Sequence, residues 1–386
     1  MRSFRLTQIK HSYLIISLLT ATSMGLASTV WANNQTLIDL GRQLYFDVSL
    51  SKDRTQSCAT CHAPAAGFID NRDNGIMGMA SLGDDQISIG DRQAPMAAYA
   101  VFSPKFHYSD KAKAFKGGQF WDGRAPDLAA QAGGPPLNPA EMAMPSKQAV
   151  VARLQANTTY ETSFKQQFGK QIWQQPEQAY TAMTQAIAAY EASPEVSPFD
   201  SKYDRYLTGK YQLTGQEELG MALFFSNNNT NCNSCHMLRQ AEQPRETFSN
   251  YEFHNIGTPS NLALRAKNGV DASFVDPGLL ANPQVDDPQA LGAFKVPSLR
   301  NVAITGPYMH NGVFQELNTV LAFYDQFNNP QRDTNPETGQ PWRAPEAPNT
   351  VNHQLLEAKV LTDAKLAALE AFLRTLTDKR YEHLLH

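Results

Sequence analysis

The sequence predicts a mainly α-helical protein of two related domains with long loops. A chain of 386 residues exceeds one ordinary hydrophobic core and favours two domains of roughly 150 to 200 residues each. The segment at residues 41–46 (GRQLYF) returns at 220–225 (GMALFF), which indicates that the two domains are repeats. Strand-like alternation of apolar residues is scarce, whereas helical spacing recurs near the end of each half.

One amphipathic helix is predicted at the end of each half. In the first half the apolar face follows Pro176, a residue suited to a first helical turn, and consists of Tyr180, Met183, Ile187 and Tyr190. In the second half Thr362 and Asp363 can cap a helix whose apolar face consists of Leu366, Leu369, Phe372, Leu373 and Leu376. A proline-punctuated linker at 193–199 (SPEVSPF) predicts domains at 33–194 and 195–386. His383 and His386 follow the last helix in a short tail, where disorder is common.

Residues 1–32 have the pattern of a secretory signal peptide. Arg2, Arg5 and Lys10 precede an apolar stretch at 13–26, and the segment ends at Ala32. The apolar stretch is shorter than the roughly 20 residues that a membrane-spanning helix needs. Cleavage and export, to the periplasm, are therefore predicted rather than a membrane anchor, and no other segment is a candidate span.

The charge balance argues against one class of partner. The chain carries 33 basic and 37 acidic side chains, a net charge of −4, and signal removal takes away three basic residues, which leaves −7. An acidic chain without runs of Lys or Arg is a poor candidate for nucleic-acid binding.

The cysteines indicate two covalently bound haem c groups. All four lie in two copies of C-x-x-C-H, formed by Cys58, Cys61 and His62 and by Cys232, Cys235 and His236. This spacing lets two thiols bond to the vinyl groups of one haem while the adjoining histidine binds the iron. Two short disulfides or redox pairs are the alternative in an exported protein. They leave the histidine after each pair unexplained.

Further blocks resemble the bacterial di-haem cytochrome c peroxidase and MauG family. They are residues 120–125 (FWDGRA), 138–142 (NPAEM), 197–200 (SPFD), 294–301 (FKVPSLRN) and 305–312 (TGPYMHNG), with Gln131 and Pro135 between the first two. The blocks occur in the order found in that family, and the resemblance extends over most of residues 37 to 377. The resemblance implies two cytochrome c-like haem domains, the first reacting with peroxide and the second exchanging electrons.

The resemblance also implies roles for four residues. Glu141 would move a proton between the peroxide oxygens, a duty that suits a carboxylate in a partly dry pocket. Gln131 would hydrogen-bond the bound ligand, Pro135 would shape the pocket, and Trp121 would relay electrons between the haems. A surface or capping acid is the alternative for Glu141, and core packing is the alternative for Trp121.

Two positions depart from the peroxidase pattern. Asp91 stands where the peroxidases carry a histidine that caps the first iron, and no histidine occurs between His62 and His107. Met77 and Met79 are alternative caps, although methionines in such a loop more often pack. We therefore expect the first haem to be open without reductive activation, as in MauG.

The second departure concerns the other iron. The peroxidases' axial methionine position falls at Tyr324, where MauG also has a tyrosine. A phenolate favours ferric and higher oxidation states, so we expect Tyr324 to be the sixth ligand, with Met309 as the rival.

Family resemblance also implies a calcium ion between the domains. Thr305 and Pro307 match its backbone carbonyl ligands, but Tyr99 stands at the position of its asparagine ligand, which weakens the site.

The predicted function is that of an exported di-haem peroxidase. It would reduce hydrogen peroxide with electrons from a small cytochrome or a cupredoxin. A MauG-like enzyme that oxidises a partner protein is one alternative. A non-catalytic electron-transfer cytochrome, with both irons six-coordinate, is the other.

Overall fold

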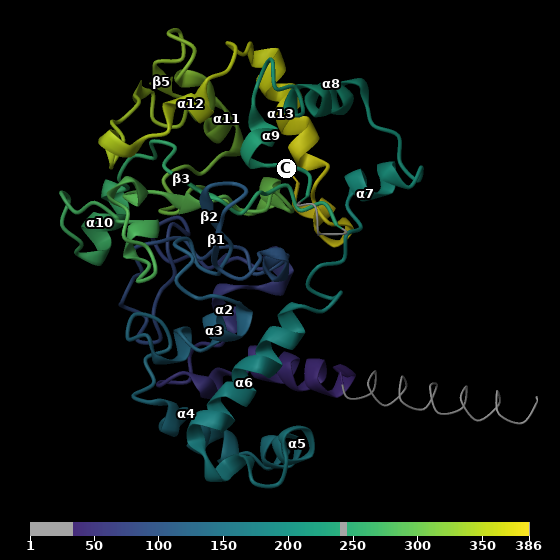
Figure 1. The fold of residues 1–386 in the computed structure, drawn as a ribbon, viewed down its shortest axis with the longest axis vertical. Helices are drawn as coiled ribbons and strands as arrows, with labels where there is room; N and C mark the ends of the chain where they lie inside the picture. Colours follow the sequence, from purple (N-terminus) through teal and green to yellow (C-terminus); the bar gives the residue numbers. More distant parts are fainter. Residues whose placement is uncertain (1–33, 240–244, 386) are drawn as a thin grey trace, which may run out of the picture.

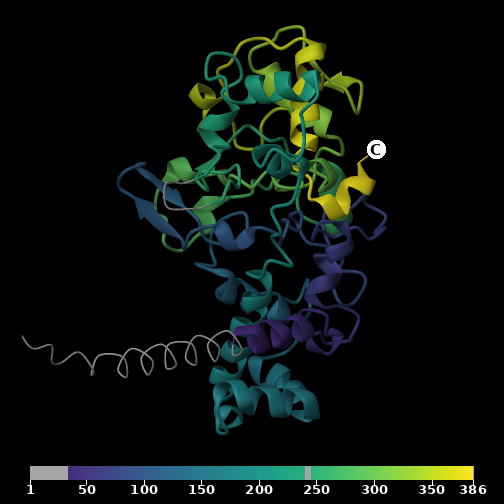
Figure 2. The ribbon, with the colours of Figure 1, turned by 90° about the vertical axis from the view of Figure 1, so that its right-hand side faces the viewer.

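The computed structural model describes residues 34–239 and 245–385. The predicted signal peptide and His386 lie outside these residues. Figure 1 shows two lobes along the long axis, with α4, α5 and α6 at one end and α8, α11 and α13 at the other; Figure 2 shows the same division after a quarter turn. Within the described ranges, no helix is long and apolar enough to cross a membrane.

Helices dominate the fold, as predicted. Besides a helix over residues 34–45, the α-helices are α2 (Cys58–Cys61), α3 (Leu128–Ala132), α4 (Lys147–Ala156), α5 (Thr158–Phe168), α6 (Pro176–Glu191), α7 (Lys202–Leu207), α8 (Gly215–Phe224), α9 (Cys232–Cys235), α10 (Leu262–Asn268), α11 (Leu317–Gln326), α12 (His353–Leu356) and α13 (Asp363–Arg374). Single turns of 3-10 helix are η1 (Val48–Leu50), η2 (Pro64–Ala66), η3 (Ala100–Phe102), η4 (Pro135–Leu137), η5 (Ile172–Gln174), η6 (Leu279–Ala281), η7 (Pro288–Ala290), η8 (Val302–Ile304) and η9 (Pro348–Thr350), and η10 (Lys379–Leu384) is longer.

Short strands form three antiparallel pairs. They are β1 (His107–Ser109) with β2 (Ala114–Lys116), β3 (Phe253–His254) with β4 (Phe294–Lys295), and β5 (Thr334–Asn335) with β6 (Gln340–Pro341). The rest of the chain runs in long connections.

Each lobe has its own apolar core beneath its last long helix. The helix α6 begins at Pro176 and buries Tyr180, Met183, Ile187 and Tyr190, as their spacing predicts. In the second lobe the Thr362 hydroxyl accepts a hydrogen bond from the Lys365 amide and caps α13, whose apolar face packs on α8 and α11. The helix α6 therefore begins at the proline predicted for its first turn, and α13 begins after its predicted Thr362 cap.

A glycine in each lobe lets two helices cross at close range. A Cβ atom on Gly41 would lie 1.8 Å from the Ala186 carbonyl oxygen of α6, and one on Gly220 of α8 would lie 1.8 Å from the Ala368 carbonyl oxygen of α13. Only a residue without a side chain fits such a contact. The repeat that contains Gly41 and Gly220 therefore marks the same helix crossing in both lobes.

Segments from both halves meet at the boundary between the lobes. Lys116 of β2 forms a bridge with Glu252, beside β3, and its Nζ lies 2.9 Å from the Glu252 carboxylate. The Arg92 guanidinium reaches Asp276 at 2.6 Å. The apolar clusters on either side comprise residues between 40 and 196 and between 203 and 376, and the division near residue 195 stays a prediction.

The C-terminal tail differs from the expectation of disorder. His383 lies in η10, and Tyr381 in the same turn is buried and donates a hydrogen bond to the Pro64 carbonyl of the first half. The segment is too short for a periodic pattern, and its partner is distant in the sequence. Its order therefore comes from tertiary packing.

Candidate active site

A cavity of about 570 Å³ gathers the residues predicted to handle peroxide. Its wall includes His62, Gln131, Pro135 and Glu141, together with Trp121. The volume lies in the range typical of cofactor and small-molecule sites. We call this the first cavity.

The turn that presents His62 is fixed locally. Ser57 and Thr60 form a capping box at the start of α2, and the His62 amide donates to the Cys58 carbonyl at 2.9 Å. The Tyr45 hydroxyl, from the helix over 34–45, donates to the His62 carbonyl at 2.9 Å. Burial lowers the pKa of His62, which keeps its imidazole neutral, the form that binds metals.

The thiols of the first C-x-x-C-H segment differ from those of a redox pair. All four thiols lie within the described residues and none is in a disulfide. Burial raises the pKa of Cys58, and it raises the pKa of Cys61 to about 11. Redox-active C-x-x-C pairs instead have a lowered thiol pKa.

Glu141 is held by the turn that precedes it. The Asn138 side-chain amide donates to Glu141 Oε1 at 2.7 Å, and the Glu141 amide donates to the Asn138 carbonyl at 3.0 Å. Burial raises the pKa of Glu141, and this outweighs the opposing effects of Asn138 and Arg124. A carboxyl fixed in this way can accept and release a proton inside the cavity.

Apart from His62, no histidine lines the described wall of the first cavity. Asp91 lines this cavity. Met77 is exposed, Met79 is buried elsewhere, and neither lines the cavity. Met96 does line it, a residue that the sequence did not single out.

Two charged residues of the wall also escaped sequence reasoning. Arg92 binds the carboxylates of Asp122 at 2.7 Å and of Asp276 at 2.6 Å. Glu191, the last residue of α6, is buried and lines the same cavity. No local pattern marks either residue, because the partners of Arg92 are distant in the sequence and the burial of Glu191 arises only in the folded chain.

A second cavity, of about 220 Å³, surrounds the other C-x-x-C-H segment and is lined by Cys232, Cys235 and His236. The His236 Nδ1 atom lies 3.1 Å from the Phe248 carbonyl oxygen, the kind of backbone contact that orients metal-binding histidines. Burial lowers the pKa of His236 to about 4, so its imidazole is neutral at pH 7. These residues fit a second haem.

Both predicted rivals for the sixth position lie on the second cavity's wall. Tyr324 comes from α11 and Met309 from the connection between η8 and α11. Burial raises the pKa of Tyr324, so its phenol needs nearby positive charge to ionise. His254 and His310 also line this cavity, and the His310 ring stacks on Phe294 at 3.5 Å between centroids.

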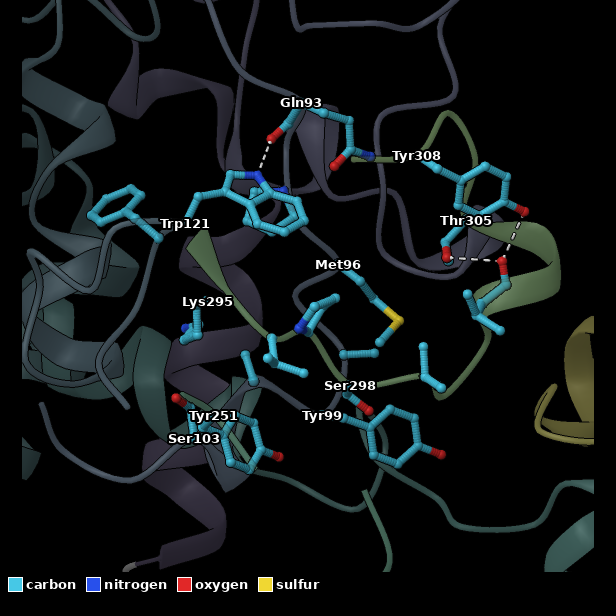
Figure 3. Close-up of a pocket in the computed structure, with 18 of the residues that line it drawn as sticks. Gln93, Met96, Tyr99, Ser103, Trp121, Tyr251, Lys295, Ser298, Thr305 and Tyr308 are labelled. Carbon is cyan, nitrogen blue, oxygen red and sulfur yellow. Dashed lines mark hydrogen bonds between the residues drawn. The ribbon is translucent and has the colours of Figure 1, made fainter. Parts of the chain in front are cut away.

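Trp121 lies between the two cavities. It lines both of them, and also a third cavity of about 150 Å³ shown in Figure 3. Its indole Nε1 donates to the Gln93 carbonyl at 2.8 Å, and its own carbonyl accepts from the Lys295 amide at 2.9 Å. One bond holds the ring and the other its backbone, so the indole has a fixed position between the sites.

The third cavity also brings together the residues predicted for calcium. Thr305, Pro307 and Tyr99 all line it, and Figure 3 shows Tyr99 on the side away from Trp121. The Tyr99 hydroxyl donates to the Asp378 carboxylate. Its oxygen is therefore already engaged with the second half of the chain.

Comparisons with known proteins show which family has this architecture. Residues 35–212 match the family model described as di-haem cytochrome c peroxidase. The chain is 51% identical over 366 residues to the methylamine utilization protein MauG of Paracoccus denitrificans, which covers 94% of this chain and 93% of that protein. It is 33% identical over 276 residues to the cytochrome c peroxidase Ccp of Escherichia coli, covering 71% of this chain and 50% of that protein.

A solved structure agrees. The di-haem peroxidase BthA of Burkholderia thailandensis superposes with a TM-score of 0.79 at 35% identity, covering 91% of this chain and 88% of that chain. A di-haem family implies two c-type haems, and the two cavities with their C-x-x-C-H segments match that number. The chain belongs to the di-haem cytochrome c peroxidase and MauG family and is a di-haem oxidoreductase.

Proposed function

We propose that this protein reduces hydrogen peroxide in the first cavity and draws the electrons through the second. The observation that carries this proposal is the grouping of Gln131, Pro135 and Glu141 with His62 around one cavity whose described wall holds no second histidine. Two c-type haems would be held by the cysteines of α2 and α9, with His62 and His236 as proximal ligands. When bound, each haem supplies an iron centre for redox chemistry.

The side chains of the first cavity have complementary duties. Glu141, fixed by Asn138, takes a proton from one peroxide oxygen and returns it to the other, so that the second oxygen can leave as water. The first oxygen leaves as water only after two electrons and two further protons have been supplied. Gln131 donates a hydrogen bond to the bound oxygen, and Pro135 restricts the space beside it. The net reaction consumes two protons and two electrons for each peroxide and yields two waters.

Electron delivery is proposed to run through Trp121, since its indole lines both cavities. For the second iron we propose Tyr324 as sixth ligand, with Met309 as the alternative on the same wall. A calcium ion near Thr305 and Pro307 stays a prediction. It is weakened because the Tyr99 hydroxyl, which lines the same cavity, already donates a hydrogen bond to Asp378.

The proposed location is the periplasm, and the proposed electron donor is a small cytochrome c or a cupredoxin. The mature chain would carry a net charge of −7, which favours a basic donor. A donor of this kind would bring one electron at a time to the second haem.

A MauG-like oxidation of a partner protein is the second candidate. It is favoured by the 51% identity to a MauG over most of both chains. It is also favoured by Tyr324 at the position of the peroxidases' axial methionine, and by Asp91 at the position of their capping histidine. In that case the two electrons come from side chains of the partner rather than from a donor cytochrome.

The test compares two substrates in the presence of peroxide. Catalytic oxidation of a reduced small cytochrome c, which disappears in Glu141→Gln, supports peroxidase function. Failure to oxidise any reduced cytochrome or cupredoxin, with covalent oxidation of a co-purifying protein seen by mass spectrometry, would instead support the MauG-like candidate. A protein that does neither would contradict both.

A further inference from the structure

Glu191 is a buried carboxyl that the proposed chemistry does not use. Its side chain is 5% exposed, it lines the first cavity, and its Oε2 atom has no hydrogen-bond partner among the described residues. A buried polar group without a partner costs stability. Such a group calls for an explanation beyond folding.

The repeated helix crossing indicates what the fold itself needs at this position. The Gly41 crossing involves Ala186 and Tyr190, and the Gly220 crossing involves Ala368 and Phe372. Continuing by one residue pairs Glu191 with Leu373, which lines the second cavity. The same helix end therefore carries an apolar side chain in one lobe and a carboxyl in the other.

Neither the helix nor the neighbouring charges stabilise an ionised Glu191. It is the last residue of α6, where the helix dipole disfavours negative charge. Tyr45, in the helix over 34–45, and Cys58, in α2, interact electrostatically with Glu191, and neither is a cation. Burial raises the pKa of Glu191 to about 8, the direction expected for a carboxyl without a cation beside it.

The cations of the cavity wall are already paired. Besides Glu191, the acidic and basic side chains of the wall are those of Asp91, Arg92, Asp122, Arg124 and Glu141. Both arginines bind Asp122, and Arg92 also binds Asp276. Because Glu191 and His62 line the same cavity, the charge of an iron held by His62 would act on the Glu191 carboxyl.

We propose that Glu191 couples a proton to the oxidation state of the first haem. When that haem accepts one electron from a donor, the Glu191 carboxylate takes one proton from solvent, so the net charge of the cavity is unchanged. Reoxidation releases the proton. The proposal rests on the haem site proposed at His62 and adds a positioning residue to it, one that supplies charge compensation without touching peroxide.

The test is a redox titration of the holoprotein from about pH 6 to about pH 9, a range that spans the expected ionisation. The variants are Glu191→Gln, nearly isosteric, and Glu191→Leu, which carries the residue found at 373. Glu195→Gln is the matched control, because Glu195 lies four residues further on, is half exposed and pairs with Arg42. The first haem is identified as the one lost in the double variant Cys58→Ala/Cys61→Ala.

The expected result is a difference in first-haem reduction potential between wild type and the Glu191 variants, and this difference should grow with pH. An ionised carboxylate stabilises the oxidised haem, so the wild-type first-haem potential should fall below that of Glu191→Gln and Glu191→Leu as the pH rises. At the acid end wild type and Glu191→Gln should agree. Glu195→Gln should follow wild type, and the second haem should not respond.

Two outcomes would overturn the proposal. One is a first-haem potential that has the same pH dependence in wild type and Glu191→Gln. The other is an offset that does not change with pH, as a merely structural role would produce. Because the titration uses no peroxide, loss of peroxide turnover has no bearing on it. Retention of both haems in the Cys58→Ala/Cys61→Ala variant would contradict the proposed haem site itself, and the Glu191 proposal with it.

Discussion

Glu141 and Glu191 occupy one cavity, but their surroundings differ. Asn138 fixes the Glu141 carboxyl with a hydrogen bond of 2.7 Å, whereas Glu191 Oε2 has no partner among the described residues. A fixed orientation suits proton transfer to a substrate, and a buried unpaired carboxyl suits a response to the charge of its surroundings. The two acids therefore have different proposed duties.

Replacing Glu141 by Gln removes the proton carrier with almost no change in shape. We expect the rate of reaction with peroxide to fall by about 100-fold or more, the usual range for loss of a general acid–base group. Stopped-flow absorption of the ferric protein mixed with peroxide measures this rate. Glu177→Gln, at an exposed carboxyl, is the control, and an unchanged rate in Glu141→Gln would remove Glu141 from the mechanism.

The sixth ligand of the second haem is tested by Tyr324→Phe and Met309→Leu. We expect Tyr324→Phe alone to change the low-spin ferric signal, because it removes the phenol oxygen and keeps the ring that lines the cavity. Electron paramagnetic resonance of each purified variant measures this signal. A change in Met309→Leu only would assign the ligand to Met309.

Local spacing decides which site residues sequence reasoning can find. The C-x-x-C-H segments are complete within five residues, so their chemistry is readable without a structure. Arg92 depends on Asp276, 184 residues away, and Glu191 depends on the burial of a helix end. Such contacts arise only when the chain has folded.

At the scale of elements, the two helix crossings explain the repeat. The segments at 41–46 and 220–225 are similar because each must bring a glycine against a helix backbone at the same kind of crossing. Tyr99 and Asn301 are a further pair of corresponding positions in the two halves. Both have a positive φ, and each precedes a short 3-10 helix, η3 after Tyr99 and η8 after Asn301. The repeat at 41–46 and 220–225 is therefore found where the helix crossing restricts the side chains.

Gly220→Ala tests the crossing of α8 with α13. The added methyl would lie 1.8 Å from the Ala368 carbonyl oxygen, so the helices must separate, and we expect a loss of about 1–3 kcal/mol or more in the free energy of unfolding. Chemical denaturation of the holoprotein followed by circular dichroism measures it. Gly215→Ala is the control in the same helix, because nothing lies within 4 Å of its new methyl. Equal stability of the two variants would contradict a close crossing.

Helices and loops were not equally predictable. The starts of α6 and α13 followed from Pro176 and from the Thr362 cap, whereas the long connections carry no period. Their positions depend on contacts such as Tyr381 with Pro64, which join residues far apart in the chain.

For the whole molecule, the proposed electron path crosses the boundary between the lobes at Trp121. The Asp378 carboxylate binds the Tyr99 hydroxyl and, at 3.0 Å, the Asn301 side-chain amide. Arg92 joins the first cavity's wall to Asp276. These buried polar contacts restrict relative movement of the lobes and so keep Trp121 between the two cavities.

Trp121→Phe should slow electron exchange between the haems. The substitution keeps an aromatic ring but removes the indole and its hydrogen bond to Gln93. We expect the spectra of the separate ferric haems to be preserved and transfer after reduction of one haem to be slower, as pulse radiolysis would measure. Wild-type transfer rates in the variant would assign Trp121 to core packing alone.

We propose that the first haem is open and reacts with peroxide without prior reduction, and spectroscopy of the ferric protein tests this most directly. Electron paramagnetic resonance and absorption spectra are recorded on the purified ferric protein before and after one equivalent of peroxide. We expect one high-spin and one low-spin haem, with both spectra changed by peroxide. Two low-spin haems that do not respond to peroxide would contradict it.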